Sequence, residues 1–543
     1  MKKQVLLIML FFLVCFSLLA QGIEIKGKVT DKTFGEGIPG VTVIVKGTTR
    51  GVVTNVDGEY SLTASPEESL VFSFVGYRPV TELVGNRTII DVVLDENISD
   101  LDAVLVVGYS SQRKADITGS IVAVDLGPIQ GQSMSSGNPM QALQGRVPGL
   151  YVEKSGDPSG ASSRVLIRGV STLGNNDPLY VIDGVPTKRP EVFASLNPEA
   201  IESIQVLKDA SASSIYGSRA ANGVIVVTTK NRASGGESLQ VTINSIGSVL
   251  SERQQRYKML NSLQRGEVLW RAMVNDGANP NSGYGEIYNF DWNGDFNNPI
   301  LNSITLKPFV GGNPNVPAGD TDWQDALYKT GYSFNNEVTV STRSEKSSLM
   351  INLGHLKNTG ILKYTGFERY SGRINANTFL FSNKVRFGIN SQFTNSNETP
   401  AARDVGNAPV PGLAITLAPT IPVKDANGEF AGPLGAGYSD RNNPLLMQYL
   451  NRWDNNRKNN FYGNVFAEWF ILENLTYKTS VGVDYSTFFR RDIEPTVRNG
   501  FITRSNNRLF HDTNEFSSLV FSNTLNWNWA KENHRIDVLA GVE

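Results

Sequence analysis

Hydrophobic and polar residues alternate along the second half of the chain. From Leu475 to Tyr485 every second residue is Leu, Tyr, Thr or Val, and the residues between them are polar or Gly. The stretch from Ser518 to Trp529 repeats the pattern, with Leu, Phe and Trp set against Ser, Thr and Asn. A period of two places one kind of side chain on each face of a β-strand. Because the alternation lasts about ten residues and aromatic residues flank it, it is typical of a transmembrane β-strand.

The region 239–543 is predicted to contain about nine such strands. We place them near residues 240–250, 335–343, 346–356, 367–381, 384–397, 459–470, 474–487, 515–530 and 533–543. Very short links follow the second, fourth, sixth and eighth strands, whereas long links follow the first, fifth and seventh. Short periplasmic turns that alternate with long outer loops are typical of outer-membrane β-barrels. An open barrel edge would leave backbone groups unpaired in lipid, so we expect further strands to complete the barrel.

The N-terminus has the pattern of a secretory signal peptide. Lys2 and Lys3 precede the apolar run from Val5 to Ala20, and a small residue ends that run. We therefore expect residues 1–20 to be removed on export. Cys15, the only cysteine, lies in this segment. The mature chain then holds no disulfide, thiolate metal site or cysteine nucleophile.

Two smaller regions lie between the signal peptide and the predicted barrel. Residues 21–97 contain short alternating strands separated by turn residues such as Asp57-Gly58, which predicts a small β-sandwich. Residues 115–232 mix short strands with short helices, and Asn-Pro pairs at 138 and 197 are suited to helix starts. We predict an α+β domain there. The fold class is therefore mainly β, with a sandwich, an α+β domain and the first part of an antiparallel barrel.

Composition and charge exclude several classes of function. Lys and Arg number 50 against 52 Asp and Glu, a balance that argues against a nucleic-acid binder. No apolar run long enough for a transmembrane helix follows the N-terminus. Asp291, Asn293 and Asp295 have the spacing that begins a calcium loop, but the rest of that motif is missing. We predict no catalytic residue, no metal site and no cofactor.

The first two regions carry motifs that resemble a known family. Residues 21–97 resemble the carboxypeptidase regulatory-like domain, a non-catalytic sandwich. Residues 115–232 resemble the plug of TonB-dependent outer-membrane receptors, and Thr321–Gln324 is similar to the SusC/RagA branch of that family. The plug motifs that carry the resemblance include Gly145, Arg146, Arg168, Gly169, Asp183, Gly184, Tyr216, Gly217 and Arg219.

The resemblance implies a function for the linker 98–114. It contains a segment that looks like a TonB box: Asp102, Ala103, Val104, Leu105, Val106, Val107 and Gly108. TonB adds a strand to such a segment, which therefore needs β-prone residues and free backbone groups. The alternative is an ordinary strand of the sandwich. Ala103 stands where the family often has an acidic residue.

The resemblance implies an active importer in the outer membrane of a Gram-negative bacterium. It implies a barrel of about 22 strands around a plug, with the sandwich and the TonB box in the periplasm. The implied partners are TonB with ExbB and ExbD, a SusD-like surface lipoprotein and outer-membrane lipid. The implied substrates are oligosaccharides or oligopeptides. Arg146, Arg168 and Arg219 are candidates for ion pairs with carboxylates of the barrel wall, the alternative being solvated surface arginines.

Three other functions were weighed against import. A signalling receptor usually carries an extra periplasmic domain before the sandwich, and there is no room for one between Gln21 and Ile23. A carboxypeptidase would need zinc ligands, yet no histidine precedes His355. A siderophore or cobalamin receptor fits less well with residues 21–97. Substrate identity and contacts are not predicted, and we expect specificity to lie in outer loops such as 251–334 and 397–459.

Overall fold

The computed structural model describes residues 23–32, 36–48, 50–74, 77, 79–94, 104–107, 110–113, 121–124, 138–153, 159, 163–209, 213–230, 239–251, 256–402, 409–434, 437–438, 441–499, 502–531 and 534–543. The predicted signal peptide, 1–20, lies outside them. The chain forms two compact units, one that contains the N-terminal sandwich and one that contains most of the remaining chain. Each unit is described by itself.

The N-terminal unit is a β-sandwich of two sheets. The first sheet has the order β4-β1-β7 and the second the order β3-β2-β5-β6. The strands are β1 (Ile23–Asp31), β2 (Thr42–Val45), β3 (Gly51–Val53), β4 (Glu59–Ala64), β5 (Ser69–Ser73), β6 (Val80–Leu83) and β7 (Val92–Leu94). The core between the sheets includes Ile25, Val43 and Phe72, all fully buried. This architecture confirms the predicted sandwich.

Tyr60 joins the two sheets of this sandwich. Its ring meets Phe72 edge to face at 5.3 Å. Its hydroxyl donates a hydrogen bond of 2.8 Å to the carbonyl oxygen of Ile90. Burial raises the pKa of Tyr60 to about 12, so the hydroxyl stays a donor at every physiological pH.

Strands β8 (Val104–Val107) and β9 (Ser110–Arg113) form a separate two-stranded sheet. The predicted TonB box therefore includes an extended segment at Val104–Val107, while Asp102, Ala103 and Gly108 lie outside the described residues. Valine and leucine favour this conformation because branched side chains fit a pleated strand.

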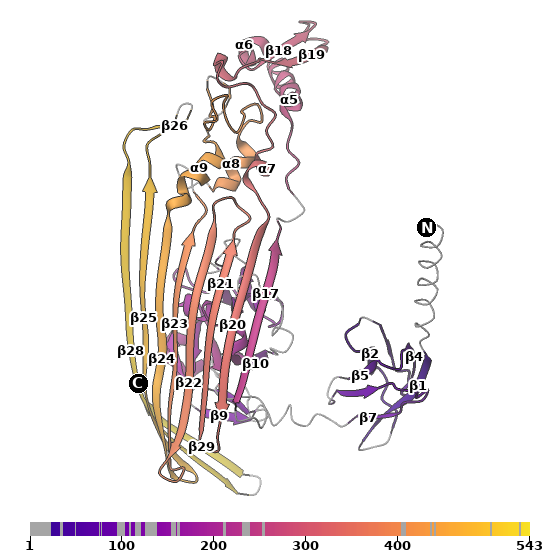
Figure 1. The fold of residues 1–543 in the computed structure, drawn as a ribbon, viewed down its shortest axis with the longest axis vertical. Coiled ribbons are helices and arrows are strands. Elements are labelled where there is room, and N and C mark those ends of the chain that lie inside the picture. Colours follow the sequence, from indigo (N-terminus) through magenta and orange to yellow (C-terminus); the bar gives the residue numbers. More distant parts are fainter. Residues whose placement is uncertain are drawn as a thin grey trace, which may run out of the picture. The chain divides into compact units, whose positions relative to one another are not determined.

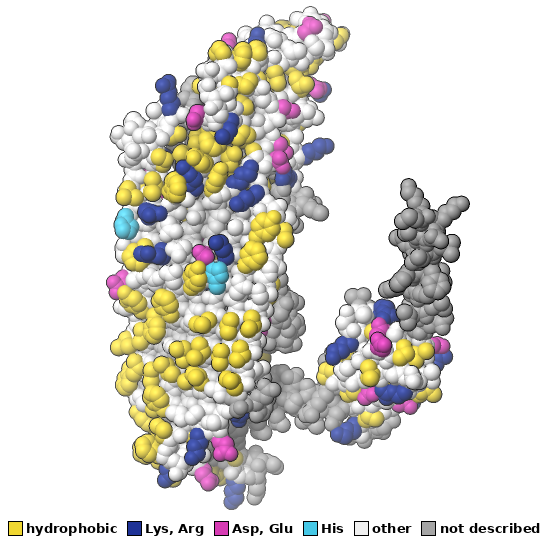
Figure 2. Space-filling view, viewed as in Figure 1, with side chains coloured by type: hydrophobic (Ala, Val, Ile, Leu, Met, Phe, Trp, Pro, Cys, Tyr) yellow, Lys and Arg dark blue, Asp and Glu magenta, His cyan; other side chains and the backbone are white. Residues whose placement is uncertain are grey.

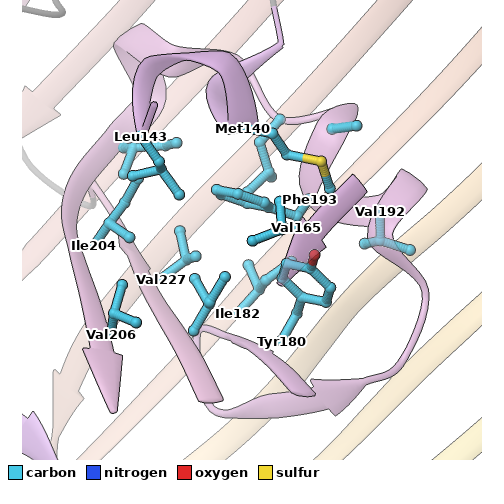
Figure 3. Close-up of a cluster of buried hydrophobic side chains, with 14 of the residues drawn as sticks. Met140, Leu143, Val165, Tyr180, Ile182, Val192, Phe193, Ile204, Val206 and Val227 are labelled. Atoms are coloured by element: carbon cyan, nitrogen blue, oxygen red, sulfur yellow. The ribbon is translucent and has the colours of Figure 1, made fainter. Parts of the chain in front are cut away.

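The second unit contains the α+β domain, which we call the plug and define as the described residues between 121 and 230. Its main sheet has the order β10-β15-β16-β13-β14, and β11 and β12 form a small second sheet. The elements are β10 (Ile121–Val124), α2 (Pro139–Ala142), β11 (Leu150–Glu153), β12 (Arg164–Ile167), β13 (Leu179–Ile182), β14 (Val185–Thr187), α3 (Pro190–Ala194), η3 (Pro198–Ala200), β15 (Ile201–Leu207), η4 (Ser214–Ala220) and β16 (Val224–Thr229). Figure 3 shows the plug core, in which Tyr180, Phe193 and Ile182 point toward one another beneath Met140 and Leu143.

Helix starts in the plug follow the Asn-Pro pattern seen in the sequence. The Asn138 side chain accepts a hydrogen bond from the amide of Met140 at 2.9 Å. The Asn197 side chain does the same for the amide of Glu199 at 2.8 Å. A proline at the next position needs no donor partner, so each short helix begins without an unpaired amide at that residue.

Nine antiparallel strands form the large sheet of this unit, which we call the wall (Figure 1). They are β17 (Leu239–Leu250), β20 (Gly331–Arg343), β21 (Ser347–Thr359), β22 (Gly366–Leu380), β23 (Val385–Thr399), β24 (Asn455–Leu472), β25 (Leu475–Glu494), β28 (Arg508–Lys531) and β29 (His534–Val542). Neighbouring strands pair in this order. Each predicted strand has its counterpart, which confirms a partial barrel.

Several wall strands are longer than the sequence pattern predicted. β25 continues to Glu494 and β28 begins at Arg508, and the two pair along this whole length. The extension lies at the end of the wall that carries the long links. We call this end the outer end, because short turns mark the periplasmic side. Strands of this length exceed what a bilayer core requires, so the wall rises above the membrane on the outer side.

The two faces of the wall differ as the alternation predicted. On β25, Gly482, Asp484 and Ser486 are buried against the plug, whereas Val481 and Tyr485 are exposed. Figure 2 shows hydrophobic side chains gathered over the outward face of the wall. The exposed hydrophobic residues of this face include Phe334, Leu353, Phe393, Phe461, Trp469, Leu519 and Phe521. An apolar band on the outward face fits contact with lipid.

The long outer links are folded, although the sequence patterns predicted only loops there. They contain α5 (Ser262–Asn275), α6 (Pro280–Tyr284), β18 (Tyr288–Trp292), β19 (Leu301–Leu306), η5 (Val310–Gly312), α7 (Trp323–Leu327), α8 (Val410–Thr416), α9 (Pro444–Leu450), η7 (Asn451–Trp453), β26 (Val497–Asn499) and β27 (Ile502–Arg504). Trp270, Tyr288 and Trp323 are buried in one core shared by the links 251–330 and 400–454. No helix in the described ranges is long and apolar enough to cross a membrane.

Candidate functional site at the contact between plug and wall

The plug lies against the inner face of the wall (Figure 1), and polar side chains line most of that contact. The described wall residues that bond to the plug include Asn352, Arg369, Arg373, Asn375, Gln392, Asn460, Tyr462, Asn464 and Asp484. They lie on one face of the alternating strands, the face to which the sequence pattern assigned Asp484. A polar contact surface is chemically able to exchange its hydrogen bonds for water.

The first buried ion pair joins Asp183 of the plug to Arg373 of the wall. The Arg373 guanidinium contacts the Asp183 carboxylate and also donates to the Thr229 hydroxyl at 2.7 Å. The Asp183 carboxylate accepts two more hydrogen bonds, each 2.9 Å long, from the amide and the hydroxyl of Thr229. Only 4% of the Arg373 side chain is exposed. Both charges are therefore compensated inside the contact.

A tight turn places the Asp183 carboxylate in this position. Asp183 has φ of 50° and Gly184 has φ of 86°, and both residues connect β13 to β14. Asp tolerates the left-handed region better than most residues, and Gly adopts it freely. The motif Asp183-Gly184 thus allows the hairpin to reverse while the carboxylate turns toward the wall.

The second buried ion pair joins Arg189 of the plug to Asp484 of β25. The Arg189 Nη1 atom lies 2.6 Å from Oδ1 of Asp484, and the Thr187 hydroxyl donates to the same carboxylate at 2.8 Å. Arg189 also donates to the Asn460 side chain at 3.0 Å, and its guanidinium lies 4.9 Å from the centre of the Phe516 ring. A single plug arginine therefore contacts three wall strands.

One wall side chain takes part in the hydrophobic core of the plug. Tyr462 of β24 is 4% exposed and belongs to the core cluster that also holds Ile182 and Val185. Its hydroxyl donates to the carbonyl oxygen of Val185 at 2.5 Å. Next to it, a side-chain carbon added at Gly482 would lie 2.8 Å from the side chain of Val185. The backbones of plug and wall therefore approach closely on β24 and β25.

Of the three arginines selected from the sequence, Arg219 pairs with a carboxylate at the end of the wall, as expected, whereas Arg168 does not pair with the wall. Arg168 pairs with Asp209, which belongs to the plug itself, so the predicted wall partner is wrong for this residue. Arg219 contacts Glu543, directly after β29. Arg146 is exposed. Arg168 has φ of 60° and Gly169 has φ of 90°, so a left-handed turn follows β12 at the residue that pairs with Asp209.

Other plug motif residues have backbone or core roles. Gly145, Gly169 and Gly217 have φ of 73°, 90° and 62°, conformations that side chains disfavour. Tyr216 is 3% exposed and packs inside the plug. These positions explain why the motif needs Gly and a buried aromatic residue.

Sequence reasoning missed Arg189 and all of its wall partners. Arg189 and Asp484 are 295 residues apart, so their pairing depends on the fold. One sequence feature could have indicated it: Asp484 is an acidic residue on the polar face of a predicted transmembrane strand, where an unpaired charge is costly.

The polar spacing at Asp291, Asn293 and Asp295 serves a turn between β18 and β19. The Asn293 side chain accepts hydrogen bonds from the amides of Asp295 and Ile300 at 3.2 and 3.0 Å. The Asp295 side chain accepts one from the amide of Asn297 at 2.9 Å. The described part of the chain contains no group of three or more His, Cys, Asp or Glu residues suited to a metal ion.

Asp454 gives the outer end of β24 and β25 a predictable pH dependence. Its carboxylate accepts a hydrogen bond of 2.7 Å from the amide of Ile493, and burial raises its pKa to about 6. The unfolded value is roughly 3.9, so the folded state binds the proton more tightly and stability falls as pH rises from about 4 to 6. We expect higher hydrogen-exchange protection factors near Ile493 at pH 4 than at pH 7.

The matched variant for this prediction is Asp454→Asn, which keeps the acceptor oxygen and removes the charge. Its protection factors near Ile493 should not change between pH 4 and pH 7. An equal pH dependence in the variant and the parent protein would assign the effect to another group.

Comparison with known proteins agrees with this architecture. Residues 113–224 match the TonB-dependent Receptor Plug Domain, and residues 25–106 match the CarboxypepD_reg-like domain. TonB-dependent receptor P26 of Formosa agariphila is 31% identical over 541 residues, covering 97% of this chain and 49% of that protein. TonB-dependent receptor SusC of Bacteroides thetaiotaomicron is 31% identical over 518 residues, covering 90% of this chain and 47% of that protein.

The fold has a counterpart among solved structures. The RagAB peptide importer in its open-open state matches with a TM-score of 0.64 and 24% identity, covering 81% of this chain and 48% of that chain. The chain thus spans about half the length of the proteins it matches. The plug, the wall and these similarities define a TonB-dependent outer-membrane receptor. Within that class, the chain belongs to the SusC/RagA type.

Membership of this class carries two general consequences. Receptors of this class are outer-membrane β-barrel proteins with a periplasmic N-terminal region, and they are not enzymes. The carboxypeptidase alternative is thereby set aside, since the N-terminal match is to a regulatory-like domain.

Proposed function

We propose that this chain forms the plug-bearing half of a transporter that imports a large nutrient across the outer membrane with energy from TonB. The observation that carries the proposal is the plug itself, which is held on the inner face of the wall mainly by hydrogen bonds and two buried ion pairs. A permanent seal would be packed with apolar side chains. A polar contact can open when force is applied, because water replaces each lost bond.

We propose Val104–Val107, with its flanking residues 102, 103 and 108, as the TonB-binding segment. The extended conformation of β8 supports this role, because strand addition requires a backbone that is already extended. TonB would act with ExbB and ExbD. The alternative, a strand of the sandwich, is favoured by the match to the regulatory-like domain, which runs to residue 106. The experiments below separate the two.

We propose an oligosaccharide or an oligopeptide as the substrate, delivered by a SusD-like lipoprotein on the outer side. Support for a polar ligand comes from a small pocket of about 90 Å³ between plug and wall at the outer end. Glu191 and Ser195 of the plug line it together with Arg369, Lys458 and Asn460 of the wall. Charged and polar groups on the plug side and on the wall side of this pocket suit a polar ligand with many hydrogen-bonding groups. A signalling role and a siderophore or cobalamin ligand remain the alternatives.

Uptake by cells that make the full-length protein tests this proposal. Wild type and a deletion of residues 102–108 are offered labelled oligosaccharides and peptides, with barrel assembly checked by heat-modifiable migration on gels. We expect the deletion to abolish uptake of one ligand class while the barrel still assembles. Uptake that survives the deletion would show that the segment does not bind TonB and serves only as a structural strand or linker, and it would reopen the signalling alternative.

A further inference from the structure

The plug contacts two parts of the wall, and only one of these contacts adds hydrophobic packing to its polar bonds among the described residues. On β24 and β25 the Arg189–Asp484 ion pair is joined by hydrophobic interdigitation: Tyr462 enters the plug core, and Gly482 allows Val185 to approach the wall backbone. Among the described residues, Tyr462 is the one wall side chain in that buried core. Removing this side of the plug would expose apolar surface to water, which is unfavourable.

On β22 and β23 the contact is polar. We call Arg373, Asn375 and Gln392 the polar belt. Arg373 bonds to Asp183 and Thr229, and Asn375 donates to the Thr229 hydroxyl at 2.8 Å and to the Lys230 carbonyl at 2.6 Å. Gln392 donates to the carbonyl and hydroxyl oxygens of Ser195 at 3.2 and 3.1 Å. Water can take over each of these bonds as the contact opens.

Pockets lie at both ends of these same two strands. The outer pocket, of about 90 Å³, is lined by Arg369 of β22 and Thr394 of β23 together with Ser195 of the plug. The inner pocket, of about 370 Å³, is lined by Asn377 of β22 and Arg386 of β23 together with Glu202 of the plug. The belt lies between the two pockets along the strands, over a rise of about 3.3 Å per residue.

We propose that imported substrate passes between the plug and strands β22–β23, across the polar belt, while the plug stays attached to β24–β25. This inference rests on the proposed function. The outer pocket would receive the substrate, the belt would open by exchanging its bonds for water, and the inner pocket would release the substrate toward the periplasm. The belt is polar, and charged side chains line both pockets beside Phe367 and Phe488 in the outer pocket and Phe379 in the inner one, which suits a hydrophilic ligand with some apolar surface.

A disulfide between plug and β25 tests whether the plug must leave the wall there. A side-chain carbon at position 482 would lie 3.4 Å from Cβ of Val185, close to the spacing of roughly 3.5–4.5 Å found in disulfides. In the full-length double variant Val185→Cys/Gly482→Cys, we expect uptake after oxidation to equal uptake after reduction. Comparing one variant in two redox states cancels the effect of the substitutions. A block that reduction relieves overturns the proposal.

Labelling of single cysteines tests the belt itself. Gln392→Cys lies in the belt, and Thr187→Cys lies on the β25 side. During uptake of the proposed substrate, we expect a membrane-impermeant maleimide to label Gln392→Cys at least about tenfold faster than without substrate, since labelling follows the open population. Thr187→Cys should not change. Equal acceleration of both, or acceleration of Thr187→Cys alone, rejects the route.

The same labelling in the variant that lacks residues 102–108 separates this inference from the proposed function. Loss of both uptake and Gln392→Cys labelling supports the two together. Uptake that depends on residues 102–108 without faster labelling of Gln392→Cys overturns the route and leaves the proposed function standing. If the variant that lacks residues 102–108 takes up substrate as well as the wild type does, the proposed function is overturned, whatever the labelling shows.

Discussion

Replacing Arg373 by Met should release the plug from β22. The substitution keeps most of the side-chain volume but leaves the Asp183 carboxylate buried without its ion-pair partner. Breaking one member of a buried pair costs about 3–5 kcal/mol, chiefly because the remaining charge is uncompensated. We expect faster hydrogen exchange and proteolysis in residues 179–187, and entry of antibiotics that the closed plug excludes.

The matched control removes both charges at once. In Asp183→Asn/Arg373→Met the buried site is neutral, and the Asn side chain can still accept from Thr229, whose amide and hydroxyl lie 2.9 Å from the native carboxylate. Residues 179–187 should therefore regain much of their protection from hydrogen exchange and proteolysis. If these residues exchange as fast in the double variant as in Arg373→Met alone, the effect comes from lost packing rather than from the unpaired charge.

Replacing Tyr462 by Ala should loosen the plug from β24 by a comparable amount. Tyr462 is 4% exposed in the plug core, and its truncation leaves a cavity among Ile182 and Val185. Large-to-small changes of this kind cost about 3–5 kcal/mol. The measurement is the denaturant concentration at which the plug becomes sensitive to protease in the assembled barrel.

Tyr462→Phe provides the control for this prediction. It keeps the ring and removes only the hydrogen bond to the Val185 carbonyl. We expect a loss near 1 kcal/mol, the usual net value for one hydrogen bond. A similar loss in both variants would mean that the ring contributes little to holding the plug.

The sequence predicted the wall well because its constraint is local. Lipid on one side and polar groups on the other impose a period of two, which is visible from Leu475 to Tyr485 without any partner strand. The same period assigned Asp484 to the polar face. The predicted strand ends on the outer side were less accurate. β25 continues above the membrane to Glu494, where lipid no longer imposes alternation on the sequence.

The folded outer links and the plug contacts could not be predicted in the same way. The buried core around Trp270 and Trp323 joins segments about 150 residues apart in the chain, so its helices depend on tertiary packing rather than on local pattern. The partner of Arg168 depends on the fold of the plug itself, and the partner of Arg189 depends on how the plug is oriented within the wall. The Asp183-Gly184 pair was selected for its motif, yet its contact with Arg373 needed the register of β22.

Uptake by the variant Leu105→Pro, compared with Leu105→Ala, tests the central claim most directly. Position 105 lies within β8, where proline removes a backbone donor that an added TonB strand needs, whereas alanine keeps it. We expect the barrel to assemble in both variants, with uptake and cross-linking to TonB lost in Leu105→Pro and kept in Leu105→Ala. Normal uptake by Leu105→Pro would contradict TonB-driven import through this segment.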